Sequence, residues 1–283
     1  LQGGVEGDEA QLSDHEVLFI IVHQVFELWF KLLLRELTTV RDAMNQPNVP
    51  DQDISRVVGS LDRCRVILDR AADHFQVKET LTTRDFLDFR DKLLPASGFQ
   101  SAQMRELEVL LGLSDDARIS LGADGGYLRA LEGFDGTPSP ALARVLARQA
   151  DTPTLSDVAE DWLHRTPIRG SGPADPGDDT VVRAFIDDYV AACRADAGDL
   201  EILAGRQART PEGRAALVRR YEESLDGVRR FLLADDVAER GAAEQTRRSR
   251  IRAAIVFIES YRDEPLLAWP RAAIAGLVAL EQA

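Results

Sequence analysis

A single histidine, His23, lies within a strongly apolar stretch, "SDHEVLFIIVHQVFELWFKLLLREL", which covers residues 13–37. An imidazole in such a place has two interpretations. It can be a core residue whose hydrogen-bonding capacity is satisfied by the protein, or it can orient a polar group of a bound ligand. The local sequence leaves both interpretations open.

A second candidate is Arg90, which lies in the aromatic segment "FLDFRD" directly before the bend "PASGFQS". An arginine beside aromatic side chains can bind a carboxylate through two parallel N–H···O bonds while a flat ring packs nearby. The alternative is a structural ion pair with Asp85, Asp88 or Asp91. The local spacing by itself favours the ion pair.

Few other residues suggest chemistry. The sequence has none of the common glycine-rich phosphate-binding, zinc-hydrolase or serine-hydrolase motifs. Paired acids such as Asp178 and Asp179 are interpreted as helix caps or solvated side chains. The remaining histidines stand alone and are interpreted as structural or surface residues: His15, His74 and His164.

Both candidates fall on predicted helices. Ser13 and Glu16 form an S-x-x-E capping box, which predicts that a helix begins there. Apolar residues then recur with a 3.6-residue period around most of the circumference, so we expect this helix to be deeply buried. After Thr83, the segment "RDFLDFRDKLL" predicts a short amphipathic helix that carries Phe86 and Arg90.

The rest of the chain shows the same helical period. A second helix is expected from about Ile54 to Phe75, and another over "SAQMRELEVLLGL". Two final helices, over "RSRIRAAIVFIESYRDEP" and "RAAIAGLVALEQA", are separated by Pro265 and Pro270. No strand-like alternation of useful length occurs. The fold class is therefore predicted to be all-α.

The middle of the chain is different in composition. The apolar pattern loosens from about 113 to 177, and "RGSGPADPGDD" predicts an exposed loop. From about 180 to 240 the sequence is rich in Ala, Arg and Glu, which is typical of long, partly exposed helices. We therefore expect a single helical domain over 1–283 with a partly exposed helical insertion at about 113–245.

Composition excludes several classes of partner. The net charge of -14 repels nucleic acid and anionic lipid. The two cysteines, Cys64 and Cys193, lie far apart without a C-x-x-C pair, which is typical of a reducing cytoplasm. We expect no membrane span, because His23, Gln24 and Glu27 interrupt the apolar run.

Two segments resemble the signature segments of the tryptophan 2,3-dioxygenase family: "LFIIVHQVFELWFKLLLREL" and "FRDKLLPASGFQSAQMRELE". The second is particularly specific. Two others, "DWLHRTP" and "RAAIVFIESYRDEP", are similar to later regions of the family. The resemblance is continuous from about Leu12 to Leu110, patchy through the middle, and returns from about Arg248 to the end.

The resemblance implies an all-α helical bundle of the tryptophan 2,3-dioxygenase type that binds haem (iron protoporphyrin IX). It also implies the activity, in which both atoms of O₂ are inserted across the C2–C3 bond of L-tryptophan to give N-formylkynurenine. Family members contribute an N-terminal segment to a neighbouring subunit's pocket, and the first helix is apolar over more of its surface than one layer of neighbours readily buries. A homotetramer is therefore expected here.

The resemblance also implies residue roles. His23 matches the distal histidine that faces the indole nitrogen, and Phe19 matches the aromatic residue that packs against the indole. Arg90 matches the arginine that pairs with the substrate carboxylate, and Ser97 matches a small residue near the haem edge. Phe86 lies at a substrate-binding position where many members have tyrosine, so one pocket hydroxyl is absent here.

The chain departs from the family pattern in further places. Val25 and Phe26 replace small polar residues of the family, so the surroundings of His23 are expected to be more apolar. The proximal haem histidine and the "GTGGSSG" substrate loop are expected beyond Ala283.

Three interpretations of the function remain open. The first is a tryptophan dioxygenase. The second is a haem-dependent monooxygenase of tryptophan or a substituted tryptophan in a biosynthetic pathway, and the third is a non-catalytic helical assembly protein.

Overall fold

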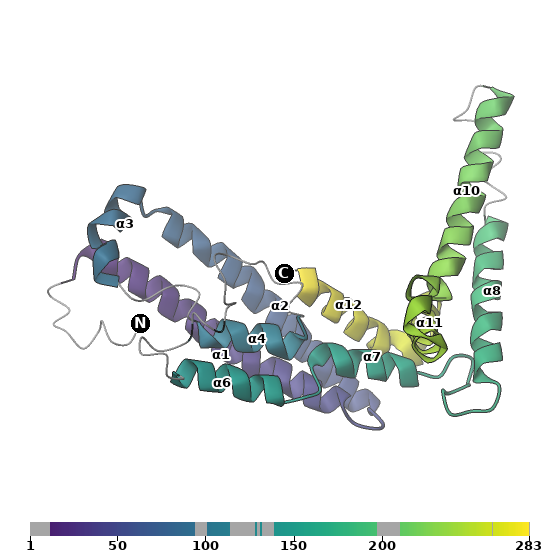
Figure 1. The fold of residues 1–283 in the computed structure, drawn as a ribbon, viewed down its shortest axis with the longest axis horizontal. Coiled ribbons are helices and arrows are strands. Elements are labelled where there is room, and N and C mark those ends of the chain that lie inside the picture. Colours follow the sequence, from purple (N-terminus) through teal and green to yellow (C-terminus); the bar gives the residue numbers. More distant parts are fainter. Residues whose placement is uncertain are drawn as a thin grey trace. The chain divides into compact units, whose positions relative to one another are not determined.

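The computed structural model describes residues 12–93, 101–113, 128, 131, 139–196, 210–261 and 263–282 (Figure 1). Within these ranges the elements are α-helices and short 3₁₀-helices without a strand, which confirms the all-α prediction. The chain forms two compact units, Leu1–Ala159 with Ala272–Ala283, and Glu160–Arg271. The single domain with an insertion at about 113–245 stays a prediction.

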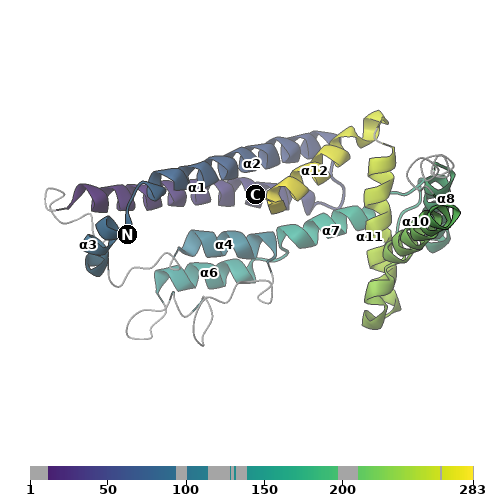
Figure 2. The same ribbon diagram turned by 90° about the horizontal axis from the view of Figure 1, so that it is seen from above.

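The first unit is built on two long helices with shorter ones beside them. Its elements are α1 (Asp14–Met44), α2 (Asp51–Glu79), α3 (Thr83–Arg90), the 3₁₀-helix η2 (Asp91–Leu93), α4 (Ala102–Leu111), α6 (Pro140–Ala150), the start of α7 (Leu155–Arg165) and most of α12 (Ala268–Gln282). Helices α1 and α2 run side by side in both views, and α4 lies along α1 and α6 (Figures 1 and 2).

The start of α1 is set by local chemistry. The Ser13 hydroxyl accepts a hydrogen bond from the Glu16 backbone N–H at 3.2 Å, as the capping box predicts. The second half of the box is wrong, because the Glu16 carboxylate is buried and forms an ion pair with Lys92 Nζ at 3.5 Å. The complete capping box belongs instead to α3, where Thr82 and Asp85 each accept from the other's backbone N–H.

The core of this unit lies between α1 and α2. Leu33 and Leu37 of α1 and Leu61 of α2 are almost wholly buried, and each such side chain contributes about 1.5–3 kcal/mol by leaving water. The expectation that α1 is buried around most of its circumference is wrong, since Ile21 and Leu28 remain 51% and 65% exposed. One face of α1 packs on its neighbours and the other carries apolar residues at the surface.

By length and composition alone, α1 is apolar enough to cross a membrane. The prediction that His23, Gln24 and Glu27 interrupt the run is therefore wrong by that criterion. Core helices of soluble proteins meet the same criterion, so the expectation that α1 spans no membrane stays a prediction. Here α1 packs against α2 and α4.

Two helix boundaries differ from expectation. Helix α2 spans Asp51–Glu79 and exceeds the predicted 54–75 at both ends, where polar residues give no apolar period. Pro270 does not separate helices, because it lies in the first turn of α12. A proline is tolerated there since the first backbone N–H groups of a helix have no intrahelical acceptor.

The second unit has its own core. Besides the end of α7, its elements are α8 (Asp178–Asp196), α10 (Pro211–Leu232), the 3₁₀-helix η5 (Asp235–Arg240), α11 (Ala242–Ser260), η6 (Pro265–Leu267) and the start of α12. Phe185 and Ile186 of α8 pack with Ala253 and Ala254 of α11 around Ile168. Long helices were expected in the region 180–240, and α8 and α10 pack against each other there.

A buried ion pair ties the predicted loop "RGSGPADPGDD" to α11. Arg250 donates to both carboxylate oxygens of Asp178 at 2.6 Å and to the carbonyl oxygens of His164, Thr166 and Ser171. The interpretation of Asp178 as solvated is wrong, because its side chain is 8% exposed. The charge is acceptable there because Arg250 neutralises it.

Candidate functional site

Four of the five predicted site residues come together at one end of the α1–α3 pair. The Phe19 ring lies 4.1 Å from the His23 ring and 5.7 Å from the Phe86 ring, measured between centroids. Phe89, which is buried, lies 5.6 Å from Phe19 and 5.5 Å from Phe86. We call Phe19, Phe86 and Phe89 the aromatic cluster. It joins the histidine helix to the arginine helix.

His23 is half-buried on α1, one turn after Phe19. Its Nδ1 lies 2.7 Å from the Phe19 backbone carbonyl oxygen. A carbonyl oxygen only accepts, so this hydrogen bond requires the proton on Nδ1 and leaves Nε2 of the neutral ring as an acceptor. No residue in the described ranges hydrogen-bonds to Nε2. The Phe19 carbonyl oxygen therefore holds the ring through Nδ1, and Nε2 can accept a hydrogen bond from a ligand.

The surroundings of His23 favour the neutral ring. Burial lowers the pKa of His23 below its usual value, and the nearby Lys78 ammonium lowers it further. The hydrogen bond to Phe19 and the Glu27 carboxylate act in the opposite direction without cancelling this effect. His23 Nε2 therefore stays a hydrogen-bond acceptor at neutral pH.

Arg90 ends α3 and is exposed. Its guanidinium carbon lies 5.9 Å from the centroid of the Phe86 ring, within the range of a cation–π contact. The ion pair that local spacing favoured is absent, since Arg90 pairs with no residue in the part of the chain that the structure describes. Asp85, one of the three expected partners, instead accepts a hydrogen bond from the Thr82 hydroxyl through Oδ2, and its Oδ1 lies 3.8 Å from His15 Nε2. The guanidinium donors remain available for a carboxylate.

Sequence reasoning missed a second cation at the same place. Lys78 in the last turn of α2 puts its Nζ 5.9 Å from the centroid of the Phe19 ring. It forms no ion pair within the described ranges. A lone lysine near the end of a polar helix gives no signal in the sequence, because only the packing of α2 on α1 brings it to Phe19.

Helix α4 stabilises the same region of α1. The Gln103 side-chain amide donates to the Glu27 backbone carbonyl oxygen at 2.8 Å and to its carboxylate at 2.6 Å. Glu27 lies one turn after His23, so this contact holds α4 against the histidine-bearing part of α1. Ser97, the fifth predicted site residue, lies outside the described residues, and so does any ligand beyond Ala283.

The apolar surroundings expected from Val25 and Phe26 are partly visible. Phe26 is buried, and its ring lies 5.1 Å from the His74 ring and 4.8 Å from the Phe75 ring, both on α2. His74 Nε2 is buried and has no hydrogen-bond partner among the described residues. Its ring packs on Phe26, in agreement with the interpretation of His74 as a structural or surface residue, whereas His23 faces the aromatic cluster.

Known proteins are similar to this chain over its whole length. The family model described as tryptophan 2,3-dioxygenase matches residues 4–281. The chain is 48% identical over 283 residues to the tryptophan 2,3-dioxygenase of Sorangium cellulosum (strain So ce56), covering 100% of this chain and 68% of the relative. It is 45% identical to tryptophan 2,3-dioxygenase 2 of Ralstonia nicotianae, covering 100% of this chain and 75% of that protein.

A third relative is named only as similar to the dioxygenase. A tryptophan 2,3-dioxygenase-like protein of Xanthomonas campestris pv. campestris is 44% identical over 204 residues, which cover 72% of this chain and 73% of the relative. The family model and the named relatives define an oxidoreductase enzyme with an all-α fold. The chain belongs to the tryptophan 2,3-dioxygenase family.

Proposed function

We propose that this protein catalyses the haem-dependent oxidation of L-tryptophan by O₂, opening the indole C2–C3 bond to give N-formylkynurenine. One observation carries the proposal. The aromatic cluster links His23 Nε2 to the Arg90 guanidinium, and neither group has a hydrogen-bond or ion-pair partner among the described residues. An amino acid with a flat ring and a carboxylate presents matching groups to these residues.

The residues present fit one face of a haem site. The aromatic cluster forms an apolar wall. The hydrogen bond of His23 to Phe19 uses Nδ1, so Nε2 can accept a hydrogen bond from a bound ligand. When bound, haem iron supplies the activation of O₂ that no side chain provides. We propose that Ser97 lies near the haem edge and that the proximal histidine lies beyond Ala283.

The chain's own residues bind and orient the substrate in this proposal. Arg90 binds the carboxylate through its guanidinium fork, and Phe19 and Phe86 pack against the indole ring. His23 Nε2 accepts a hydrogen bond from the indole N–H, which fixes the ring's orientation. The apolar side chains exclude water from the site.

The test is the product formed by the full-length, haem-loaded protein with L-tryptophan under ¹⁸O₂. A product containing both labelled oxygen atoms supports the proposal. A product with one labelled atom identifies a monooxygenase instead. Absence of haem binding together with absence of any oxidised product identifies a non-catalytic helical protein and contradicts the proposal.

We further propose a cytoplasmic homotetramer. Ile21 and Leu28 are seven residues apart on α1, so they share one exposed face, and a second subunit can cover them. Both Cys64 and Cys193 are free thiols, which suits a reducing compartment. Sedimentation of the full-length protein as a monomer at micromolar concentration contradicts the tetramer.

A further inference from the structure

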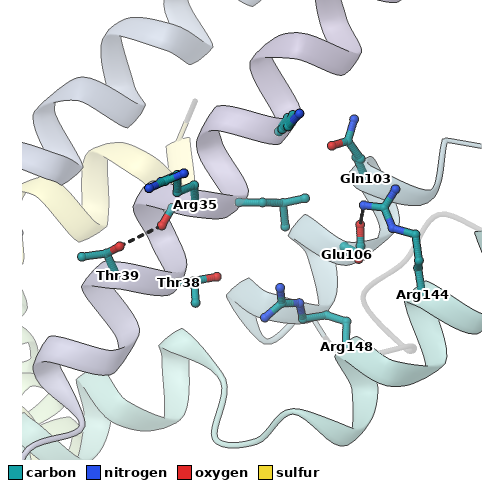
Figure 3. Close-up of a pocket in the computed structure, with 9 residues that line it drawn as sticks. Arg35, Thr38, Thr39, Gln103, Glu106, Arg144 and Arg148 are labelled. Atoms are coloured by element: carbon teal, nitrogen blue, oxygen red, sulfur yellow. Dashed lines mark hydrogen bonds and ion pairs between the residues drawn. The ribbon is translucent and has the colours of Figure 1, made fainter.

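A second candidate site lies within the first unit, between α1, α4 and α6. It is an open groove with a volume of about 610 Å³ (Figure 3). Lys31 and Arg35 line it from α1, and Arg144 and Arg148 line it from α6. The lining includes none of the proposed tryptophan-site residues Phe19, His23, Phe86 and Arg90, although it contains Gln103, which also binds Glu27 on α1.

The groove concentrates positive charge in an acidic protein. Four cations line it with one carboxylate, that of Glu106 on α4, whereas the whole chain carries 48 acidic and 34 basic residues. Glu106 is buried and binds Arg144 Nη2 at 2.6 Å. This pair neutralises one of the cations.

The two cations on α1 have no such partner. Lys31 and Arg35 form no ion pair with any residue in the described part of the chain. They lie four residues apart on one helix face, where like charges repel each other. An anion in the groove would relieve that repulsion.

Unused donors point to the same kind of ligand. Arg148 binds Asp151 through Nη1 at 2.6 Å, but its Nε is buried and has no hydrogen-bond partner among the described residues. Figure 3 shows the Arg148 side chain reaching from α6 toward Thr38 on α1, across the groove. Leu34 adds an apolar part to the lining. The walls therefore combine cationic donors, a hydroxyl and an apolar surface.

We propose that this groove binds a small polyanion that carries two or more carboxylate or phosphate groups. The volume is in the range of small-molecule sites in proteins. Separate cations on α1 and α6 suit a ligand with separated negative groups, because each group can then pair with a cation of a different helix. The inference does not depend on the proposed oxidation of tryptophan.

The experiment is calorimetric titration of the full-length, haem-loaded protein at constant ionic strength, with citrate in one arm and pyrophosphate in the other. Saturable binding in either arm supports the proposal, and the arm that binds identifies the anionic group. Arg35→Gln and Lys31→Gln should each weaken binding by about tenfold, which is the effect of losing one charge-assisted contact.

Arg56→Gln is the matched control. Arg56 is an exposed residue of α2, away from the groove lining, and its substitution removes the same charge from the same unit. Its binding constants should equal those of the wild type. Equal weakening by Arg56→Gln and Arg35→Gln would show general charge screening and overturn the proposal, as would the absence of saturable binding in both arms. Thermal melts verify that each variant is folded.

Discussion

The Nδ1 atom of His23 lies 2.7 Å from the backbone carbonyl oxygen of Phe19, one helical turn earlier. This contact fixes the tautomer, because the carbonyl requires a donor, and it directs the ring so that Nε2 is the free acceptor. The same residue, Phe19, contacts Phe86 beside Arg90. One aromatic side chain thus connects the two polar groups that the proposed substrate needs.

Replacing His23 by alanine should impair turnover more than binding. The change removes the acceptor for the indole N–H and leaves Arg90 unchanged, so kcat should fall by about 10²-fold while KM changes less. Steady-state kinetics of the full-length, haem-loaded variant measure this effect. Haem should be retained, and its loss would mean that His23 is an axial ligand of the iron.

Replacing Arg90 by lysine should impair substrate binding. Lysine keeps the charge but lacks the planar fork, so binding of tryptophan should weaken by roughly 1.5 to 3 kcal/mol. The haem absorption spectrum should remain unchanged. Arg84→Lys, on the exposed side of the same helix, is the control and should bind as the wild type does. An unchanged KM for Arg90→Lys would assign the arginine a structural role.

The pH dependence follows from the lowered pKa of His23. The folded protein keeps this ring neutral below pH 6.5, the usual pKa, so turnover of tryptophan should persist there and fall only at lower pH. The unfolded chain takes up the proton first. The stability contributed by the neutral ring is therefore complete above pH 6.5 and is lost as the pH falls from 6.5 toward the folded pKa.

Lys78 provides the test of this electrostatic cause. Lys78→Gln removes a positive charge near the ring, so the pKa of His23 should rise toward its usual value, whereas Lys78→Arg keeps the charge and should leave it nearly unchanged. Titration of the His23 Cε1–H resonance by NMR measures both variants. A wild-type pKa at or above 6.5 would contradict the argument.

Arg250→Met should strongly destabilise the second unit. It leaves Asp178 as a buried, unpaired charge and removes donors from three backbone carbonyl oxygens, so unfolding free energy should fall by about 3–5 kcal/mol. Urea denaturation followed by circular dichroism measures the loss. The added change Asp178→Asn should restore part of the stability, because it removes the unpaired charge.

The control for this prediction is Arg194→Met, which breaks a surface pair with Glu222. Both partners are about half exposed, so the cost should be about 1 kcal/mol or less. Similar losses for Arg250→Met and Arg194→Met would show that burial of the Arg250 pair has little energetic importance.

The fold class and most helix positions were predictable because their causes are local. The Ser13 cap and the 3.6-residue period of α1 act within a few residues of the chain. The errors arose where a distant residue intervened. The Glu16 carboxylate forms an ion pair with Lys92 instead of completing the capping box, and Arg250 neutralises the buried carboxylate of Asp178.

The sequence by itself determined the family, the helices and the residue types suited to an indole amino acid. Only the tertiary structure decided that Phe19 and Phe86 meet, that Arg90 is left without a carboxylate partner in the described ranges, and that Lys78 lies at the same place. The physical reason is the range of the interactions involved. Helix period and capping act over three or four residues, whereas ring contacts between α1, α2 and α3 depend on packing between segments that are far apart in the chain.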